Sequence, residues 1–575
     1  MPMTNKEVAA FLERVGEILE IRGENVFKAR AYYSAARTIE SLGEDVSKIV
    51  ADGELDELPG FGEALTEKVS ELVRTGQMKY YDEITADLPE GIFELLDVGD
   101  VGPKKVKLFY DKLGIGSVAE LEAAARSGAL AELPGMGDKS QAKILAGIEQ
   151  GKEHRGRWLL SQAVPLGERI VAVVEKLEGV KRVSLGGSIR RRRETVGDID
   201  VLVSSKRGAH VIAEFTKLDG VERVLASGDT KGSAVFSPGI QADLRVVEDK
   251  SFATALHYFT GSKEHNVRMR QLAKDRGWKL NEYGLFDGDK MLASKDEKAL
   301  FAHFGMDFIE PELREDTGEI EAALKGALPD LVESRDIRGA LHVHSDWSDG
   351  RVTIEELARE AVSHGFSYMT ISDHSQFSHG LDEKRLGEQW KEIDRVRRIA
   401  GGIDILRSCE IDIMKDGSLD IDDETLQGLE CGIASVHGST ELGAAEQTRR
   451  IIAAVSNRYV DILGHPSQRL LPDQGGMAFD VEAVLSACAA RGVAVEISAD
   501  PMRLDLDWRY IKTAKALGCK FAIGLDAHEK EHFGWLTYGV SMARKGWLEK
   551  GDILNTLTAR QFRERLGRRR KRRKA

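Results

Sequence analysis

Short apolar runs alternate with amphipathic helical patterns through the last third of the chain. The runs at 368–371, 431–435, 460–463 and 521–524 have the length of strands, and polar residues follow them directly. A helical pattern such as that of 481–492 lies between such runs. Strands that alternate with helices and carry polar residues at their C-terminal ends predict a (β/α) barrel with a site on one face.

A strand–turn–strand pattern occupies residues 183–205. Two apolar runs within it read as strands, joined by a glycine-serine turn and a short helix. Asp198 and Asp200 alternate on the second strand, so both carboxylates face the same way. The run at 239–247 predicts a further strand, and it carries Asp243. Three carboxylates are therefore candidates for a single site.

The N-terminal third contains three similar segments, 57–73, 95–114 and 132–149, each with a glycine turn before an amphipathic helix. Such turns expose backbone N–H groups at a helix N-terminus, where the helix dipole also favours an anion. Repeated three times, the pattern resembles helix-hairpin-helix modules, which hold the DNA backbone without reading sequence. The second copy departs, because Asp100 stands where the first hairpin glycine is usual. The glycines expected to bind DNA are Gly60, Gly62, Gly102, Gly135 and Gly137, and the nearby lysines are Lys68, Lys104, Lys105, Lys139 and Lys143.

Length and composition place the chain among multidomain globular proteins. Its 575 residues suggest about three to five domains, and 42% hydrophobic with 31% charged residues fits a soluble protein. No run of about 18 apolar residues predicts a transmembrane helix, and the first residues lack a signal-peptide pattern. The four cysteines form no Cys-x-x-Cys pair, which favours reduced thiols in the cytoplasm.

The net charge of −13 does not by itself indicate nucleic-acid binding. Two local clusters are basic, however: 189–195 and the C-terminal tail 567–575. Phosphate contacts need only a basic groove. The tail is open to two interpretations, a disordered solubilising end or a segment attracted non-specifically to phosphates.

The middle carboxylates suit phosphoryl transfer. With Mg²⁺ or Mn²⁺ on Asp198, Asp200 and Asp243, one ion would activate an attacking hydroxyl and the other would hold a triphosphate. Gly187 and Ser188 can cradle phosphate through backbone N–H and hydroxyl donors. A lone Asp-x-Asp is often an ordinary turn. The glycine-serine turn and the distant Asp243 together favour the metal site.

The order of motifs GGS, RR, GDIDVLV, ADLR, YFTGS and NEYGLF is similar to that of family X DNA polymerases, and 255–286 resembles their thumb almost continuously. The resemblance implies that Arg191 contacts the triphosphate and that Arg245 steadies the carboxylates. Lys263 departs from polymerase beta, which has an acidic residue there; it would strengthen nucleotide binding before metal arrives, or else simply face solvent. The other residues implied to hold the nucleotide are Tyr258, Phe259 and Gly261 at the sugar, Asn266 at the base and Arg270 at the nascent pair.

The stretch GFGEALTEK also resembles the lyase domain of DNA polymerase beta. Its Schiff-base lysine falls on Lys68, and Lys28 and Tyr32 match positions around that site. A lysine nucleophile must be deprotonated, which neighbouring cations or desolvation can arrange. The alternative is a lysine that only binds phosphate.

Six of the fourteen histidines recur in short motifs of the last third, beginning with HVHSDWSDG (342–350). The set resembles the PHP (polymerase and histidinol phosphatase) domain with every ligand position filled. Ala340 departs, because Asp is common there. Imidazole and carboxylate ligands suit about three Zn²⁺ or Mn²⁺ ions, and the implied chemistry is phosphoester hydrolysis. The nine ligands are His342, His344, Asp349, His374, Glu410, His437, His465, Asp526 and His528.

The expected organisation is multidomain α/β and α+β, and its seven parts follow the chain. They are a lyase-like helix-hairpin-helix domain (1–85), a fingers-type helix-hairpin-helix domain (86–155), a nucleotidyltransferase palm (156–250), a thumb (251–318), a linker (319–335), a PHP barrel (336–566) and the basic tail (567–575).

The sequence thus predicts a monomeric, nucleoid-associated DNA polymerase of family X that fills short gaps in DNA repair. Its partners would be gapped or primer-template DNA and deoxynucleoside triphosphates, with no membrane. The PHP site would act as a 3′–5′ exonuclease, with abasic-site endonuclease and 3′-phosphatase activity also open. Two alternatives remain: a nucleotidyltransferase joined to a small-molecule phosphatase, and a catalytically idle scaffold for DNA repair.

Overall fold

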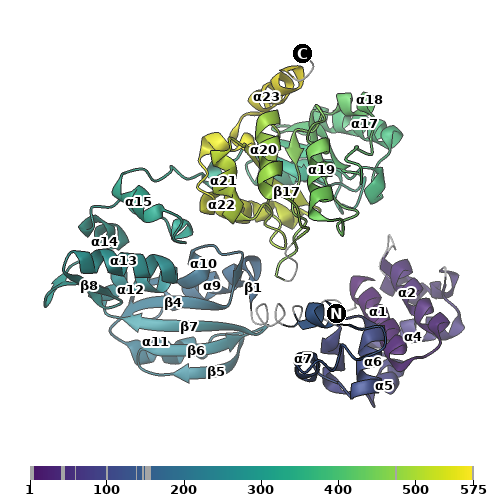
Figure 1. Ribbon diagram of the computed structural model, residues 1–575, viewed down its shortest axis with the longest axis horizontal. Helices are drawn as coiled ribbons and strands as arrows, with labels where there is room; N and C mark the ends of the chain where they lie inside the picture. The colour runs from purple at the N-terminus through teal and green to yellow at the C-terminus, as the bar shows by residue number, and fades with distance from the viewer. Residues whose placement is uncertain are drawn as a thin grey trace. The chain divides into compact units, whose positions relative to one another are not determined.

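The computed structural model describes residues 5–40, 46–58, 60–96, 98, 101–137, 139–145, 148, 157–472 and 476–572 (Figure 1). The chain divides into two compact units, Met1–Arg155 and Gly156–Ala575. No helix among these residues is long and apolar enough to cross a membrane.

The first unit is helical and has two hydrophobic cores. Leu12, Val69 and Leu72 lie in one core, and Val106 and Phe109 lie in the other. Its helices include α1 (Asn5–Arg22), α2 (Val26–Glu40), α3 (Val46–Asp52), α4 (Glu63–Thr75), α5 (Lys79–Thr85), α6 (Pro103–Leu113) and α7 (Val118–Arg126).

The second unit begins with a five-stranded sheet, which we call the palm sheet. Its strand order is β2-β4-β7-β6-β5, and the central pair β4 and β7 is parallel. Buried residues of α9 and α11, such as Ile170 and Phe215, share one core with the apolar strand residues. The elements are α9 (Leu160–Val174), β2 (Val180–Leu185), α10 (Gly187–Arg190), β4 (Asp198–Ser205), α11 (Gly208–Phe215), β5 (Val221–Ser227), β6 (Lys231–Phe236) and β7 (Ile240–Val247).

The thumb follows the palm sheet and continues into the expected linker. Ile320 and Ala323 of α15 pack in the same core as Met269 and Phe301, so the expected linker 319–335 begins with a helix that packs on the thumb. The apolar spacing of Ile320 and Ala323, three residues apart, puts both on one helix face. The elements are α12 (Phe252–Thr260), α13 (Lys263–Asp275), β8 (Trp278–Asn281), β9 (Gly284–Asp287), β10 (Lys290–Leu292), α14 (Glu297–His303) and α15 (Glu319–Leu324).

Seven parallel strands then close into a barrel in chain order, with β11 paired to both β12 and β17. Helices lie between successive strands, as the alternating pattern predicts (Figure 1). The strands are β11 (Gly339–Val343), β12 (Tyr368–Ile371), β13 (Asp404–Asp412), β14 (Cys431–Ser435), β15 (Ile462–Leu463), β16 (Ala494–Ser498) and β17 (Phe521–Ala527). The larger helices are α16 (Ile354–Ser363), α17 (Glu383–Ile399), α19 (Ala444–Ala454), α20 (Val481–Arg491), α21 (Trp508–Ala516) and α22 (Leu536–Lys545).

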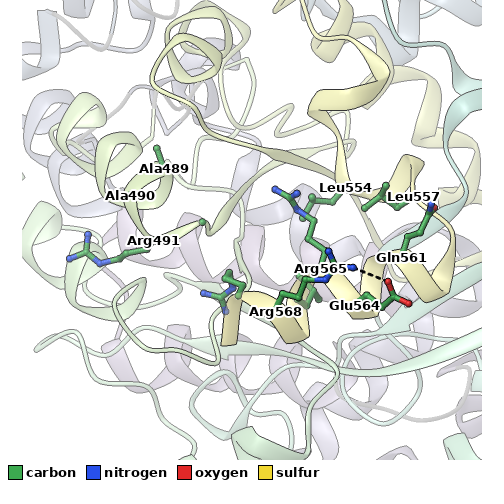
Figure 2. A pocket seen from close by; sticks show the side chains of 12 residues that line it. Ala489, Ala490, Arg491, Leu554, Leu557, Gln561, Glu564, Arg565 and Arg568 are labelled. Carbon is green, nitrogen blue, oxygen red and sulfur yellow. Dashed lines mark hydrogen bonds and ion pairs between the residues drawn. The ribbon is translucent and has the colours of Figure 1, made fainter. Parts of the chain in front are cut away.

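The basic tail expected from 567 onward is not a separate segment up to Arg572, because these residues continue helix α23 (Ala559–Arg572). Arg569 Nη2 lies 2.6 Å from Oδ1 of Asp461, a fully buried carboxylate, and Arg570 pairs with its other oxygen. A buried charge needs such partners, so Arg569 and Arg570 hold this part of α23 against the barrel. A groove of about 750 Å³ is lined by residues of α23 and of the end of α20 (Figure 2).

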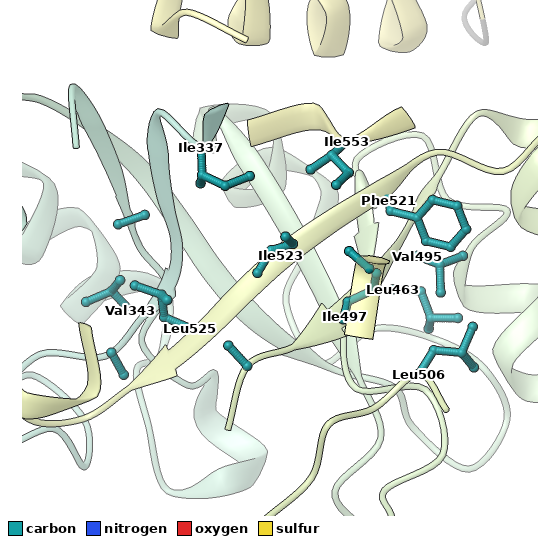
Figure 3. Close-up of a cluster of buried hydrophobic side chains, with 14 of the residues drawn as sticks. Ile337, Val343, Leu463, Val495, Ile497, Leu506, Phe521, Ile523, Leu525 and Ile553 are labelled. Carbon is teal, nitrogen blue, oxygen red and sulfur yellow. The ribbon is translucent and has the colours of Figure 1, made fainter. Parts of the chain in front are cut away.

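Successive residues of the barrel strands alternate between two cores. Phe521 and Ile523 belong to the large core that the surrounding helices share (Figure 3). Ala522, between them, belongs to a second cluster that takes residues from all seven strands and includes Phe562 of α23. Alternation along a strand separates the two faces of the sheet. The second cluster therefore fills the interior of the barrel, and α23 closes one end.

Candidate functional site

The three predicted carboxylates of the palm lie at one edge of the central strand pair. Asp198 and Asp200 open β4, and Asp200 stands directly opposite Asp243 of β7 in the parallel register. Lys231 Nζ lies 3.0 Å from Oδ2 of Asp243, and Gln241 Nε2 donates to Oδ1 at 2.9 Å. The structure thus brings together residues more than forty positions apart in the sequence.

The electrostatics of these carboxylates fit bound cations. Burial, with Asp198 and Asp243 nearby, raises the pKa of Asp200 to about 7. Burial and Asp243 likewise raise the pKa of Asp198. Burial acts in the same direction on Asp243, but hydrogen bonds from Ser233 and Gln241 and the Lys231 ammonium lower its pKa overall. Because crowding of like charges opposes ionisation, divalent cations would stabilise the ionised set.

The glycine-serine turn lies against these carboxylates. Gly187 begins α10 with φ +57°, and an added Cβ would collide with the Asp200 carboxylate. Only glycine adopts that conformation at no cost and leaves room for the carboxylate. Ser188 follows in the first turn of α10 and is half-buried. Close backbone approach is what the predicted phosphate cradle requires.

Arg191 extends from the end of α10 to the thumb. Its Nε lies 3.1 Å from Oε1 of Glu315, and its guanidinium occupies the space that a side chain at Gly261 would take. Arg245 lies over the ring of Phe259, 4.8 Å from the centroid. The residues that the family resemblance implies therefore lie in contact in two pairs. Arg191 contacts Gly261, and Arg245 contacts Phe259.

The remaining thumb residues are linked through Asn266. Its Nδ2 donates to the backbone oxygen of Tyr258 at 2.7 Å, and Arg270 Nε donates to the backbone oxygen of Asn266 at 3.3 Å. The Tyr258 ring lies edge-on to Phe259. Lys263 is exposed at the first residue of α13. These five residues lie on α12 and α13, on either side of the turn that joins the two helices.

All nine predicted PHP ligands gather at the C-terminal ends of barrel strands. Four groups of three or four of these residues have ligand atoms within 4.8 Å of one another, and together the groups contain all nine. The groups are His344–Asp349–His374–His528, His342–Glu410–His465, His342–His344–Asp526 and His374–Glu410–His437.

Glu410 lies at the centre of these groups. Its Oε1 lies 2.7 Å from His465 Nε2, and its Oε2 lies 3.1 Å from His374 Nδ1. Burial opposes ionisation of Glu410, but the surrounding imidazoles, His342 foremost, hold its pKa well below the usual value. Both oxygens are buried, and within the described residues no group is aligned to form a hydrogen bond with them despite these short distances; the same is true of both His344 nitrogens. Buried polar atoms without hydrogen-bond partners are atoms available to metals, so the residues fit the implied ions.

His342 and His344 come together by a route that simple alternation does not describe. Strand β11 ends at Val343, its register shifts between Ala340 and Val343, and His342 has φ +59°. The two rings nevertheless lie 5.2 Å apart and both are buried. A bulge therefore turns His342 toward the site, which is a common device beside active sites.

Two carboxylates that the sequence analysis missed orient the imidazoles. Glu496 Oε1 lies 2.6 Å from His342 Nδ1, and Asp412 Oδ1 lies 2.7 Å from His437 Nδ1. Such partners fix the ring and leave Nε2 for a metal. Asp412 stands two residues after Glu410 on one strand face, so its spacing was a usable signal. Glu496 is a lone acid in an apolar run, flanked in space by Gly524.

In the helical unit, Lys68 of α4 lies over the ring of Tyr80, with Nζ 4.2 Å from the centroid. Lys28 lies over the same ring at 5.1 Å, and Tyr32 stacks on it at 6.2 Å. The three residues that match the lyase site therefore share Tyr80, which the sequence analysis did not single out. Both lysine ammonium groups therefore contact the Tyr80 ring.

The hairpin glycines leave open space at helix N-termini. Gly62 and Gly102 precede α4 and α6, and an added Cβ at either would meet nothing within 4 Å. The same holds at Gly135 and Gly137, and Gly60 has φ +89°. Asp100, which departs from the repeat, lies outside the described residues.

Comparison with family models matches most of the chain. The matches are a helix-hairpin-helix domain (3–78), a SAM-like helix-hairpin-helix tandem (92–150), a DNA polymerase beta thumb (255–315) and a PHP domain (340–500).

Curated relatives match in whole and in part. The chain is 34% identical to DNA polymerase/3′-5′ exonuclease PolX of Bacillus subtilis over 96% of this chain and 97% of that protein. DNA polymerase lambda of Rattus norvegicus is 24% identical over 54% of this chain and 56% of its own length. A probable phosphatase of Thermoanaerobacter sp. is 29% identical over 36% of this chain and 84% of its own length. A match at 34% identity over nearly the whole length of both proteins means that the chain belongs to the PolX family of DNA polymerases.

Proposed function

We propose that this chain is a template-directed DNA polymerase that fills short gaps during DNA repair. The observation that carries the proposal is the pairing of Asp200 with Asp243 beside the Gly187 turn. Asp198, Asp200 and Asp243 would hold Mg²⁺ or Mn²⁺, which supply charge neutralisation for phosphoryl transfer. Gly187 and Ser188 would bind the incoming triphosphate together with Arg191, whose guanidinium neutralises phosphate charge.

The thumb residues would orient the nucleotide. Tyr258, Phe259 and Gly261 would contact the sugar, and the amide of Asn266 would reach the base. Arg270 would contact the nascent pair, and the exposed ammonium of Lys263 would attract the triphosphate. The support is their gathering around the α12–α13 turn, where Asn266 and Tyr258 are hydrogen-bonded.

The second proposed activity is 3′–5′ degradation of DNA in the barrel. The nine residues around Glu410 would hold about three Zn²⁺ or Mn²⁺ ions, which supply Lewis acidity and an activated water when bound. Glu496 and Asp412 would keep the imidazole protons on Nδ1 of His342 and His437. Cleavage at abasic sites and removal of 3′-phosphates are further reactions that the same chemistry would support.

The helical unit would hold the DNA. Backbone N–H groups at Gly60, Gly62, Gly102, Gly135 and Gly137 would contact phosphates, so affinity should fall steeply with salt and vary little with sequence. Deleting 1–150 should weaken binding to gapped DNA; unchanged binding would reduce the hairpins to spacers. We further propose that the chain acts as a monomer in the cytoplasm, at the nucleoid, with domain limits near residues 85, 155, 250, 318 and 336.

One experiment separates these functions from the alternatives. A gapped duplex labelled at its 3′ end is incubated with the protein, with and without the four deoxynucleoside triphosphates, while the metal content of the protein is measured. Templated extension with nucleotides and shortening without them supports both activities. A small phosphate ester is tested in parallel, and its hydrolysis without any reaction on the duplex would indicate a small-molecule enzyme. Binding of the duplex without extension or shortening would indicate a scaffold.

A further inference from the structure

A buried lysine of the barrel is paired with groups of the polymerase part of the chain. Lys545 ends α22, and its side chain has no solvent exposure. Its Nζ lies 2.8 Å from Oε1 of Glu315, near the end of the thumb, and donates to the backbone oxygen of Arg191 at 3.0 Å. Buried ammonium groups require such compensation. The Lys545 ammonium group therefore has the hydrogen-bond and ionic partners that its buried position requires.

Glu315 is the centre of the contact. Arg191 Nε lies 3.1 Å from the same oxygen, Oε1, that binds Lys545, and Arg193 Nη1 lies 3.4 Å from Oε2. The carboxylate is 7% exposed. Burial opposes its ionisation, but Lys545 and then Arg191 lower its pKa below the usual value. Two cations from different domains thus share one carboxylate oxygen.

The surroundings make this contact a structured interface. Lys545 Nζ lies 4.5 Å from the centroid of the Trp508 ring, and Arg193 lies 5.6 Å from it. Beside them, Arg509 of α21 lies 3.3 Å from the buried Glu194 of the palm. These aromatic and ionic contacts hold α21 and α22 against the residues that follow α10.

We propose that Lys545 is a positioning residue of the polymerase site. Its ammonium group allows Arg191 to leave Glu315 and bind the triphosphate of the nucleotide. The inference rests on the proposed role of Arg191. When Arg191 turns to phosphate, the buried Glu315 loses one partner. Lys545 stays on the same oxygen, so the carboxylate keeps a counter-charge. Without Lys545, Glu315 would keep Arg191 as its counter-charge and hold it away from the triphosphate. Through Lys545, the barrel therefore sets the nucleotide affinity of the polymerase site.

Single-nucleotide insertion into a gapped duplex by the full chain tests the inference. Lys545→Met should raise the KM for the nucleotide about tenfold and leave kcat within about twofold, because binding is affected more than chemistry. Degradation of 3′-labelled DNA should be unchanged. The matched control is Arg544→Met, because Arg544 pairs with Glu312 at 2.7 Å and does not contact Glu315, so its KM should stay at the wild-type value.

The pH profile gives a second readout. Burial lowers the pKa of Lys545 to about 8, against the opposing effect of Glu315. The other charged groups that face it are Glu194 and Arg193, with Arg191 on the same carboxylate. As pH rises through about 8, Lys545 loses its proton, so the wild-type KM should rise there. Lys545→Met should lack that transition.

Each outcome decides the inference. Glu315→Gln added to Lys545→Met removes the charge that retains Arg191, so KM should return to within about twofold of wild type. A double variant as impaired as the single one, or a wild-type KM that is flat from pH 7 to 9, would overturn the proposal. The double variant also serves if Lys545→Met alone fails to fold, because it removes the buried Glu315 carboxylate that the single variant leaves with one cation fewer. If Arg191→Ala raises KM and Lys545→Met does not, only the role of Lys545 fails; if neither does, the triphosphate role of Arg191 fails as well.

Discussion

Asp200 and Asp243 stand directly opposite each other on the neighbouring parallel strands β4 and β7. Parallel pairing places the two residues at the same edge of the palm sheet. The charge crowding that raises the pKa of Asp200 to about 7 would be relieved by that cation.

Asp243→Ala should reduce nucleotide addition by at least ~10³-fold, about 4 kcal/mol of barrier, since the phosphate charge would lose a metal ligand. Extension of a gapped primer measures the loss. Asp249→Asn is the control, because Asp249 lies in the same region but pairs with Arg182 outside the carboxylate set. Near wild-type extension by Asp243→Ala would remove Asp243 from the metal site.

His344→Ala should abolish 3′–5′ degradation and leave primer extension intact. The substitution removes a residue shared by two of the four ligand groups, and losing one ligand weakens metal binding. Mn²⁺ should support degradation better than Mg²⁺, because imidazole-rich sites bind Mg²⁺ poorly. His364→Ala is the control, since His364 pairs with Glu360 on the surface. Full degradation by His344→Ala would place the nuclease elsewhere.

Glu496→Gln should lower metal affinity about 10- to 100-fold, because the carboxylate that holds His342 Nδ1 is replaced by a neutral group. Metal content after dialysis, measured beside DNA degradation, checks this. Glu529→Gln, whose carboxylate pairs with the exposed Arg351, should keep its metal. An unchanged metal content in Glu496→Gln would mean that His342 is oriented by other contacts.

Lys68→Ala should prevent borohydride trapping of a 5′-deoxyribose phosphate, if Lys68 forms the Schiff base that the positional match implies. Lys104→Ala, in the second hairpin, should trap as well as wild type. Equal trapping by Lys68→Ala would assign the reaction to another amine and leave Lys68 as a phosphate-binding residue.

Arg569→Met combined with Arg570→Met should destabilise the protein by about 3–5 kcal/mol, because the buried Asp461 carboxylate would lose both cations. Urea unfolding measures the change. Arg565→Met with Arg568→Met removes the same charge from the exposed side of α23 and should change stability by about 0.5 kcal/mol or less. Equal losses in both pairs would show that net charge, not Asp461, matters.

Residues in spaced motifs could be predicted from the sequence, and single residues could not. Asp198 and Asp200 share a strand, and several of the PHP ligand motifs follow a recognisable apolar run. Glu496 has no such neighbour, because its role depends on His342, 154 positions away. Lys545 meets Arg191 across 354 positions, so only the folded chain relates them.

Local geometry was also beyond the sequence pattern. Alternation predicts that His342 and His344 share a strand face, but a register shift with φ +59° at His342 produces their proximity. Likewise, the basic composition of 567–575 does not predict a contact with Asp461. In the structure, Arg569 and Arg570 of this segment pair with that buried carboxylate.

The ligand group His342–His344–Asp526 lies across the line where the barrel closes, since β11 and β17 pair there as first and last strands. An ion in that group would join the two ends of the barrel chain as a crosslink does, without a covalent bond. The free energy of metal binding would then add to the stability of the closed barrel. Chelation should accordingly open the barrel first between β11 and β17, where hydrogen exchange would quicken before the other strands respond.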